Sequence, residues 1–180
     1  NYCESYHLPW VHPGLNSYSR LEDHYNIEGV GPFSGQGSLV YRQLTGADGA
    51  RFPDFAGLGP QWDEGAEYVA LYPNVLLGVH RDHAFAIVLE PAGCDRTVER
   101  LELYYAAAPA ETPALEALRA DNAAQWRKVF EEDIFVLEGM QKGRHGHLFD
   151  GGRFSPVMDG PTRDFHRWVA RQVQAGRHPG

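Results

Sequence analysis

The first twelve residues of the chain gather side chains that can bind a metal or carry a proton. Glu4, His7 and His12 lie within nine positions and are interleaved with large apolar side chains. A neutral imidazole is the commonest metal ligand among protein side chains. Two imidazoles this close, in a partly apolar setting, indicate a metal site shielded from bulk water. The alternative is two half-buried histidines at a helix end, one of them hydrogen-bonded to a carbonyl.

The spacing within this segment limits its shape. Glu4 and His7 are three apart and would share one face of a helix. His7 and His12 are five apart, which on an unbroken helix turns them about 140° from each other, too far to chelate one ion. Pro9 lies between them and disfavours helical geometry at the residue before it. We therefore predict helix up to about Leu8, followed by a bend that brings His12 back toward His7.

A third ligand would have to come from elsewhere, and the longest helical pattern of the chain offers one. Thr112-Pro113 is a typical helix start, and the pattern runs from 113 to about 142. A spacing of four, three, four, three predicts one stripe of side chains on this helix. Its members are Trp126, Phe130, Asp133, Leu137 and Met140.

Asp133 is the only charged residue on that stripe. An unpaired carboxylate in apolar surroundings costs several kcal/mol and tends to take up a proton, but it stays ionised when it binds a cation. Two other interpretations remain open: a buried salt bridge to an arginine, or a stripe exposed at its edge. Glu132, which lies beside Val129 and Val136 on the helix, is the second candidate acid.

Composition limits the class of protein. The chain has 180 residues, enough for one domain with a substantial core, and ordinary hydrophobic (43%) and charged (22%) fractions. A net charge of −8 with both signs scattered argues against a nucleic-acid surface. Cys3 and Cys94 cannot form a disulfide framework, which fits a reducing, cytoplasmic interior. No apolar run approaches the length of a transmembrane helix, so no membrane partner is expected.

Residues 66–106 are predicted to form a β core, preceded by a region at 17–65 that is rich in Gly, Pro, Ser and Asp and has two candidate strands. A strand at 25–29 and a second at 37–41 are separated by glycine-rich turn sequence, and 48–63 is predicted to be a long loop that could cover a pocket mouth. Four further strands, at 67–72, 75–79, 84–90 and 97–105, are joined by tight turns. Short strands joined in this way form an antiparallel meander.

Other histidines carry less weight in the sequence. His80 and His83 flank a predicted turn, where a solvated role is more typical than metal ligation. His24 is as well explained by a surface position as by a site. His145 and His147 lie in a glycine-rich loop. His166 belongs to a predicted amphipathic helix at 161–175, which would turn Phe165, Trp168, Val169 and Val173 inward.

The first sixteen residues resemble the iron-binding segment of Rieske-type non-heme iron oxygenase large (alpha) subunits. The likeness rests on Glu4-x-x-His7-x4-His12 followed by Pro-Gly-Leu. A second resemblance covers Phe130-Glu-Glu-Asp133-Ile with Glu138-x-x-Gln141-x-Gly143, and a third covers Gly152-Arg-Phe-Ser-Pro156 and Phe165-His-Arg-Trp168. Together they indicate a relationship over nearly the whole chain, strong at both ends and looser in the sheet.

The resemblance implies a set of roles. His7, His12 and Asp133 would form a two-histidine, one-carboxylate site for mononuclear Fe(II), which leaves positions open for O₂ and substrate. Glu4 would link this site to a [2Fe-2S] Rieske cluster of a neighbouring subunit. Asn1, on the same segment, is expected near the iron. The full-length protein is expected to be a homotrimer that receives electrons from NAD(P)H through a separate reductase.

The fold implied is α+β: a helix-grip (START/SRPBCC-like) domain, with an antiparallel sheet wrapped around a long C-terminal helix. We expect residues 1–180 to be a single catalytic domain. The family's Rieske domain, with its paired Cys-x-His and Cys-x-x-His ligands, is absent from this sequence. The cluster would therefore come from a segment cut off or from another chain.

The expected activity is hydroxylation or oxidative demethylation of an aromatic or quaternary-ammonium substrate with O₂. The expected enzyme is a mono- or dioxygenase, and Glu at position 4 favours the amine-oxidising members of the family. The alternative is a non-catalytic helix-grip domain that binds a hydrophobic small ligand.

Overall fold

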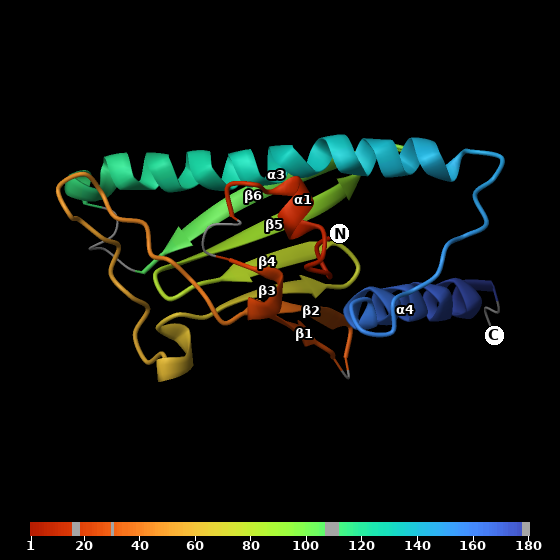
Figure 1. Ribbon diagram of the computed structural model, residues 1–180, viewed down its shortest axis with the longest axis horizontal. Helices are drawn as coiled ribbons and strands as arrows, with labels where there is room; N and C mark the ends of the chain where they lie inside the picture. The colour runs from red at the N-terminus through yellow and green to blue at the C-terminus, as the bar shows by residue number, and fades with distance from the viewer. Residues whose placement is uncertain (16–18, 30, 107–111, 178–180) are drawn as a thin grey trace.

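A six-stranded antiparallel sheet in the strand order β1 to β6 forms the centre of the computed structural model (Figure 1). The structure describes residues 1–15, 19–29, 31–106 and 112–177. Residue 16, the end of the segment with the family resemblance, and residue 30, in the predicted turn sequence, lie outside the described residues. The strands are β1 (His24–Ile27), β2 (Phe33–Ser38), β3 (Ala66–Leu71), β4 (Val75–Val79), β5 (His83–Pro91) and β6 (Thr97–Tyr105). Every strand pairs with the next along the chain, so the predicted meander is confirmed.

Two long helices follow the sheet. α3 (Glu116–Arg144) comes directly after the 3-10 turn η3 (Pro113–Leu115), and α4 (Gly160–Arg177) is the last element. Short 3-10 turns also occur at η1 (Leu21–Asp23) and η2 (Pro60–Trp62). Figure 1 shows α3 beside β5 and β6, and α4 beside β1 and β2. The predicted α+β class, with an antiparallel sheet and a long helix, is thereby confirmed.

Aromatic packing attaches α3 to the sheet. The ring of Phe85 in β5 is 1% exposed and lies 4.6 Å from the Trp126 ring and 5.3 Å from the Phe130 ring, measured between centroids. Gly78, which is paired with Phe85 across β4 and β5, leaves the space that this ring fills. Burying a Phe side chain stabilises a fold by roughly 2–3 kcal/mol. This contact fixes the half of α3 that carries Asp133.

The glycine-rich stretch before Ser38 is a strand, contrary to the prediction of a turn and loop there. β2 covers Phe33–Ser38, and only two residues of the predicted 37–41 strand belong to it. A Cβ atom at Gly35 would lie 2.0 Å from the Tyr68 carbonyl oxygen, and one at Gly37 would lie 2.0 Å from the Tyr25 ring. These glycines therefore permit close packing within the sheet and do not mark a turn.

The N-terminal helix also differs from its prediction. α1 (Leu8–Val11) begins where the helix was expected to end. Pro9 lies in its first turn, where the missing N–H costs no helical hydrogen bond, so proline starts this helix and does not break it. Residues 1–7 form turns.

The amphipathic patterns predicted more buried side chains on α3 and α4 than the structure shows. Leu137 and Met140, on the predicted inward stripe of α3, are 37% and 44% exposed, and Val169 and Val173 of α4 are also exposed. A 29-residue helix is about 43 Å long, whereas a nine-residue strand spans about 30 Å, so the sheet cannot cover all of α3.

The loop at 48–63 has a structural role in place of the predicted cover over a pocket. Phe52 is 2% exposed and packs with Leu118 of α3, and Asp54 pairs with Arg81. None of residues 48–63 lines the main cavity.

Candidate metal centre and adjoining cavity

The two N-terminal histidines occupy the two ends of α1. His7 is the N-cap residue and its carbonyl accepts the Val11 N–H at 3.0 Å, while His12 is the C-cap residue and leaves the helix with φ −116° and ψ 70°. Because one turn of helix separates the residues and the backbone changes direction at His12, the rings approach to 5.3 Å between centroids, at 76°. The predicted meeting of the two rings is observed, although the bend lies at His12 and not at Pro9.

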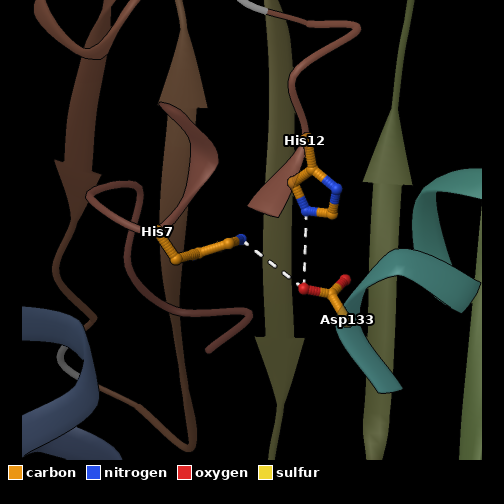
Figure 2. Close-up of side chains that lie close together, drawn as sticks. All are labelled: His7, His12 and Asp133. Atoms are coloured by element: carbon orange, nitrogen blue, oxygen red, sulfur yellow. Dashed lines mark ion pairs between the residues drawn. The ribbon is translucent and has the colours of Figure 1, made fainter. Parts of the chain in front are cut away.

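Asp133 of α3 meets both rings (Figure 2). Its Oδ1 lies 3.8 Å from His7 Nε2 and 3.4 Å from His12 Nε2, and one possible ligand atom from each of the three residues falls within 4.8 Å of the others. Metal–ligand bonds of about 2 Å place cis ligand atoms of one ion about 3 Å apart, and opposite ones about 4 Å apart. The three side chains are largely buried, with 2–15% exposed. The donor set and its spacing therefore fit a divalent metal ion.

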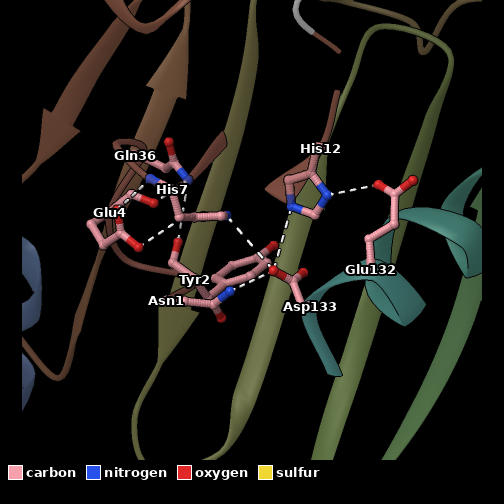
Figure 3. A network of polar contacts seen from close by, with 8 residues as sticks. All are labelled: Asn1, Tyr2, Glu4, His7, His12, Gln36, Glu132 and Asp133. Carbon is pink, nitrogen blue, oxygen red and sulfur yellow. Dashed lines mark hydrogen bonds and ion pairs between the residues drawn. The ribbon is translucent and has the colours of Figure 1, made fainter. Parts of the chain in front are cut away.

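Each imidazole contacts a glutamate carboxylate through its Nδ1 atom, on the side of the ring away from Asp133 (Figure 3). Glu4 Oε1 lies 2.7 Å from His7 Nδ1, and Glu132 Oε2 lies 3.0 Å from His12 Nδ1. A carboxylate that accepts the Nδ1 proton fixes the tautomer and leaves Nε2 as the metal-binding nitrogen. Both Nε2 atoms point toward Asp133 as a result. Glu132, the second candidate acid, thus contacts only His12, while Asp133 lies close to both rings.

Opposing effects determine the pKa of His12. Burial lowers it, but hydrogen bonds and charges from Asp133 and Glu132 outweigh burial and raise the pKa above its usual value. Such electrostatics are what a divalent cation would exploit, because the same carboxylates that favour imidazolium favour a bound metal. Among the described residues, no arginine forms an ion pair with Asp133. The alternative of a buried salt bridge between Asp133 and a described arginine is therefore excluded.

Asn1 and Glu4 complete the polar surroundings. The Asn1 side-chain amide donates to Asp133 Oδ1 at 2.6 Å, so Asn1 lies beside the expected iron position. Glu4 is 5% exposed, its Oε2 accepts the His7 backbone N–H, and its carbonyl accepts a hydrogen bond from Gln36. These contacts fix the N-terminal segment against β2.

A cavity of about 100 Å³ adjoins the three candidate ligands. His7, His12 and Asp133 line one part of it. The rest of its wall is largely aromatic and consists chiefly of Tyr41, Tyr68, Phe85, Trp126 and Phe130. The cavity therefore gives a small molecule access to the candidate metal position, between α1, α3 and the sheet.

The prediction of solvated turn histidines at 80 and 83 is wrong. His80, Asp82 and His83 are 0–1% exposed, and the His80 and His83 rings stack at 4.3 Å. Trp126 donates its indole N–H to His83 Nε2 at 2.8 Å. Sequence reasoning missed this group; the available signal was four consecutive ionisable residues, 80–83, between two strongly apolar strands.

The remaining histidines lie apart from the metal candidates. His24 is partly buried, lines the cavity and contacts Ser19 and Gln36. Burial lowers the pKa of His24. His145 contacts Asp95 at 3.4 Å at the surface, and His147 and His166 are exposed. Within the described part of the chain, no helix is both long and apolar enough to cross a membrane.

Sequence comparison gives relatives over most of the chain. Residues 1–175 match the family described as "Ring hydroxylating alpha subunit (catalytic domain)". A putrescine 2-hydroxylase of Bordetella bronchiseptica is 29% identical over 187 residues, covering 94% of this chain and 41% of that protein. A putrescine 2-hydroxylase of Ralstonia nicotianae is 28% identical over 186 residues, covering 94% and 48%. The chain spans less than half the length of these curated relatives.

Solved structures share the fold. The quaternary ammonium Rieske monooxygenase CntA in complex with substrate L-carnitine superposes with a TM-score of 0.67 at 18% identity, covering 94% of this chain and 43% of that one. A second CntA structure, described as revealing insights into inter-subunit electron transfer, gives a TM-score of 0.68 at 18% identity, covering 94% and 44%.

Proposed function

The chain belongs to the family of ring-hydroxylating alpha-subunit catalytic domains, and on that premise we propose that it hydroxylates a small amine with O₂ at one Fe(II) ion held by His7, His12 and Asp133. The observation that supports this best is the convergence of two imidazoles and one carboxylate beside a cavity. Two neutral nitrogens and one oxygen on one side of an ion leave its other positions open. A bound ferrous ion would supply reductive activation of O₂ there.

The protein residues hold and orient the parts. The two histidine Nε2 atoms and the Asp133 carboxylate would bind the Fe(II) ion. Glu4 and Glu132 set the histidine tautomers, and the Asn1 amide holds Asp133 Oδ1 in place. The aromatic wall of the cavity excludes water and positions the substrate. Insertion of one oxygen atom into a C–H bond, with the other reduced to water, consumes two electrons and two protons.

The electrons are proposed to come from outside this domain. NAD(P)H would supply them through a reductase and a [2Fe-2S] Rieske cluster carried by a neighbouring subunit of a homotrimer, in the cytoplasm. Glu4 is the proposed link, because its carboxylate contacts His7 Nδ1 while the segment around it lies at the surface, with Tyr6 43% exposed. In the whole protein, Glu4→Gln should retain iron yet slow its reoxidation by O₂ in the presence of substrate and a reduced cluster.

The substrate class follows from the relatives and the cavity. Two relatives are named for putrescine and one structural neighbour for quaternary ammonium compounds. A cavity of about 100 Å³ suits a short aliphatic molecule better than a fused-ring arene. An aromatic substrate is the second choice, supported by the aromatic cavity wall, and oxidative demethylation is the alternative reaction on an N-methylated amine.

Metal content tests the proposal. The protein is purified anaerobically, and iron is measured by elemental analysis for wild type, Asp133→Ala and Asp121→Ala. Asp121 is an exposed acid on the same helix and serves as the matched control. We expect about one Fe(II) per chain in wild type and control, and loss of most of it in Asp133→Ala. Equal, sub-stoichiometric iron in all three would favour a non-catalytic helix-grip domain that binds a hydrophobic ligand.

A further inference from the structure

A buried polar cluster lies in the wall of the cavity, away from the metal candidates. We call it the turn cluster; its members are Tyr41, Tyr68, His80, Asp82, His83 and Trp126. Tyr41, Tyr68, His80 and Trp126 line the cavity directly. Trp126 precedes Asp133 by seven residues on α3, which separates them by about 10 Å along the helix axis. A short molecule can therefore contact both.

The hydrogen bonds of the cluster fix where its protons lie. Indole N–H can only donate, so His83 Nε2, which receives it at 2.8 Å, carries no proton. The His83 proton is then on Nδ1, which donates to Asp82 Oδ1 at 2.9 Å, and the Tyr41 hydroxyl donates to the same oxygen at 2.7 Å. Burial acts to raise the pKa of Asp82, but these hydrogen bonds and the His83 contact lower it overall. Asp82 is therefore a buried anion.

This anion has no cation bound to it in the described residues. Its contact with His83 is not an ion pair, because His83 is neutral. The guanidinium of the adjacent Arg81 is directed to Asp54 and Asp63. Asp82 Oδ2 forms no hydrogen bond of normal geometry, although the Gln43 side chain also acts to lower the pKa of Asp82. Arg42 is the only lysine or arginine among the described lining residues and is exposed to solvent. Arg81 attracts Asp82 without contacting it, so part of the cost of burying this charge remains, and a cation in the cavity would offset it.

His80 offers a second unused group. Its Nε2 lies 3.2 Å from the Tyr68 hydroxyl, while its Nδ1 is buried without a partner. Burial and the neighbouring His83 hold the pKa of His80 far below its usual value, so the ring is neutral. A proton on His80 Nε2 would let the ring donate to Tyr68 and leave the Nδ1 lone pair to accept from an N–H donor.

We propose that the turn cluster binds the protonated amino group of the substrate, with an ammonium N–H directed to His80 Nδ1 and the charge balanced by Asp82. The faces of Tyr41, Tyr68 and Trp126 add cation–π attraction. The Tyr41 hydroxyl, because it donates to a carboxylate, becomes a stronger acceptor for a second N–H. The inference rests on the proposed function only in taking the bound amine to be the substrate.

Binding of a charged and a neutral probe of the same length tests the inference. The protein, loaded anaerobically with Fe(II), is titrated calorimetrically with 1,4-diaminobutane and with butane-1,4-diol. We expect the diamine to bind wild type about tenfold or more tightly than the diol, since only the diamine offers a cation. In Asp82→Asn, which keeps the shape and removes the charge, the ratio of the two dissociation constants should fall about tenfold. Glu64→Gln removes an exposed charge elsewhere and should preserve the ratio.

A second variant protects the test against misfolding of Asp82→Asn. Tyr41→Phe keeps the ring and removes the hydroxyl that contacts Asp82, and it should lower the same ratio by a smaller factor. An unchanged ratio in a folded Asp82→Asn or Tyr41→Phe protein would overturn the inference, as would equal binding of diol and diamine to wild type. Iron content is measured on the same samples, so loss of iron with an intact ratio would count against the proposed function alone.

Discussion

Glu132 Oε2 lies 3.0 Å from Nδ1 of His12, while Asp133, the next residue of α3, faces Nε2 of the same ring at 3.4 Å. Consecutive helical residues point about 100° apart, so two such side chains meet one group only when that group lies against the helix between them. The ring of His12 is 2% exposed and occupies that position. The helix thus fixes both the place and the tautomer of this candidate ligand.

Removing Glu132 should weaken metal binding without removing a ligand. In Glu132→Ala, nothing accepts the His12 Nδ1 proton, and the ring loses orientation and basicity; loss of such a partner typically costs 10–100-fold in metal affinity. Competition with a chromophoric chelator measures Fe(II) affinity directly. Glu131→Ala, on the exposed face of the same helix turn, is the control and should bind iron like wild type. Equal affinity in both variants would show that the contact is incidental.

Acid should destabilise the metal-free protein through His80. Its pKa in the folded state is far below 6.5, so below pH 6.5 the unfolded chain takes up a proton that the folded chain does not. Stability is then lost as pH falls, by up to about 1.4 kcal/mol per pH unit for this group. His12, whose pKa is raised, acts oppositely and stabilises the metal-free fold at low pH.

Urea unfolding at pH 6.5 and 5.5, in the presence of a chelator, separates these contributions. The free energy of unfolding of wild type should fall more between the two pH values than that of His80→Gln, which cannot titrate at this position. His12 is present in both proteins and cancels in the comparison. The same fall in both proteins would mean that His80 titrates freely in the folded state.

Two Gly→Ala substitutions should have opposite effects on stability. At Gly35 a Cβ would lie 2.0 Å from the Tyr68 carbonyl oxygen and 2.9 Å from the Val69 Cα, both backbone atoms, so the strands would have to separate. We expect destabilisation of about 1–3 kcal/mol or more. At Gly139, in α3, a Cβ meets nothing within 4 Å, and alanine should stabilise by about 1 kcal/mol. Thermal unfolding of both variants provides the measurement, and a shift of the same sign would contradict the packing argument.

Local sequence predicted those elements whose signals are local. The strands at 75–79 and 97–105 have the predicted bounds because runs rich in β-branched and other apolar residues end at turn residues there, and α3 ends within two residues of its predicted end. The stripe that includes Asp133 places it correctly beside the apolar residues Trp126 and Phe130. His7 and His12, which cap α1, were singled out by residue type and spacing, but their pairing with Asp133 was inferred from the resemblance, because no helical period relates residues 7, 12 and 133.

The features that were missed depend on distant contacts. Gly35 looks like a turn residue until the Tyr68 backbone is placed against it. The burial of His80 and His83 depends on Trp126, more than forty residues away, whose indole covers and hydrogen-bonds the turn. A polar turn is normally solvated, and the run of ionisable residues between two apolar strands indicates burial without identifying the helix that closes over it.

The candidate metal position joins His7 and His12 to Asp133, more than 120 residues further along the chain. An ion bound there would cross-link the amino-terminal segment to α3. Closing so long a loop is entropically expensive for an open chain, and a ligand that binds only the closed form shifts the balance toward it by mass action. Iron supply would thereby govern the lifetime of the protein as well as its chemistry: a chain starved of the ion should release its first dozen residues to proteases before the sheet itself unfolds.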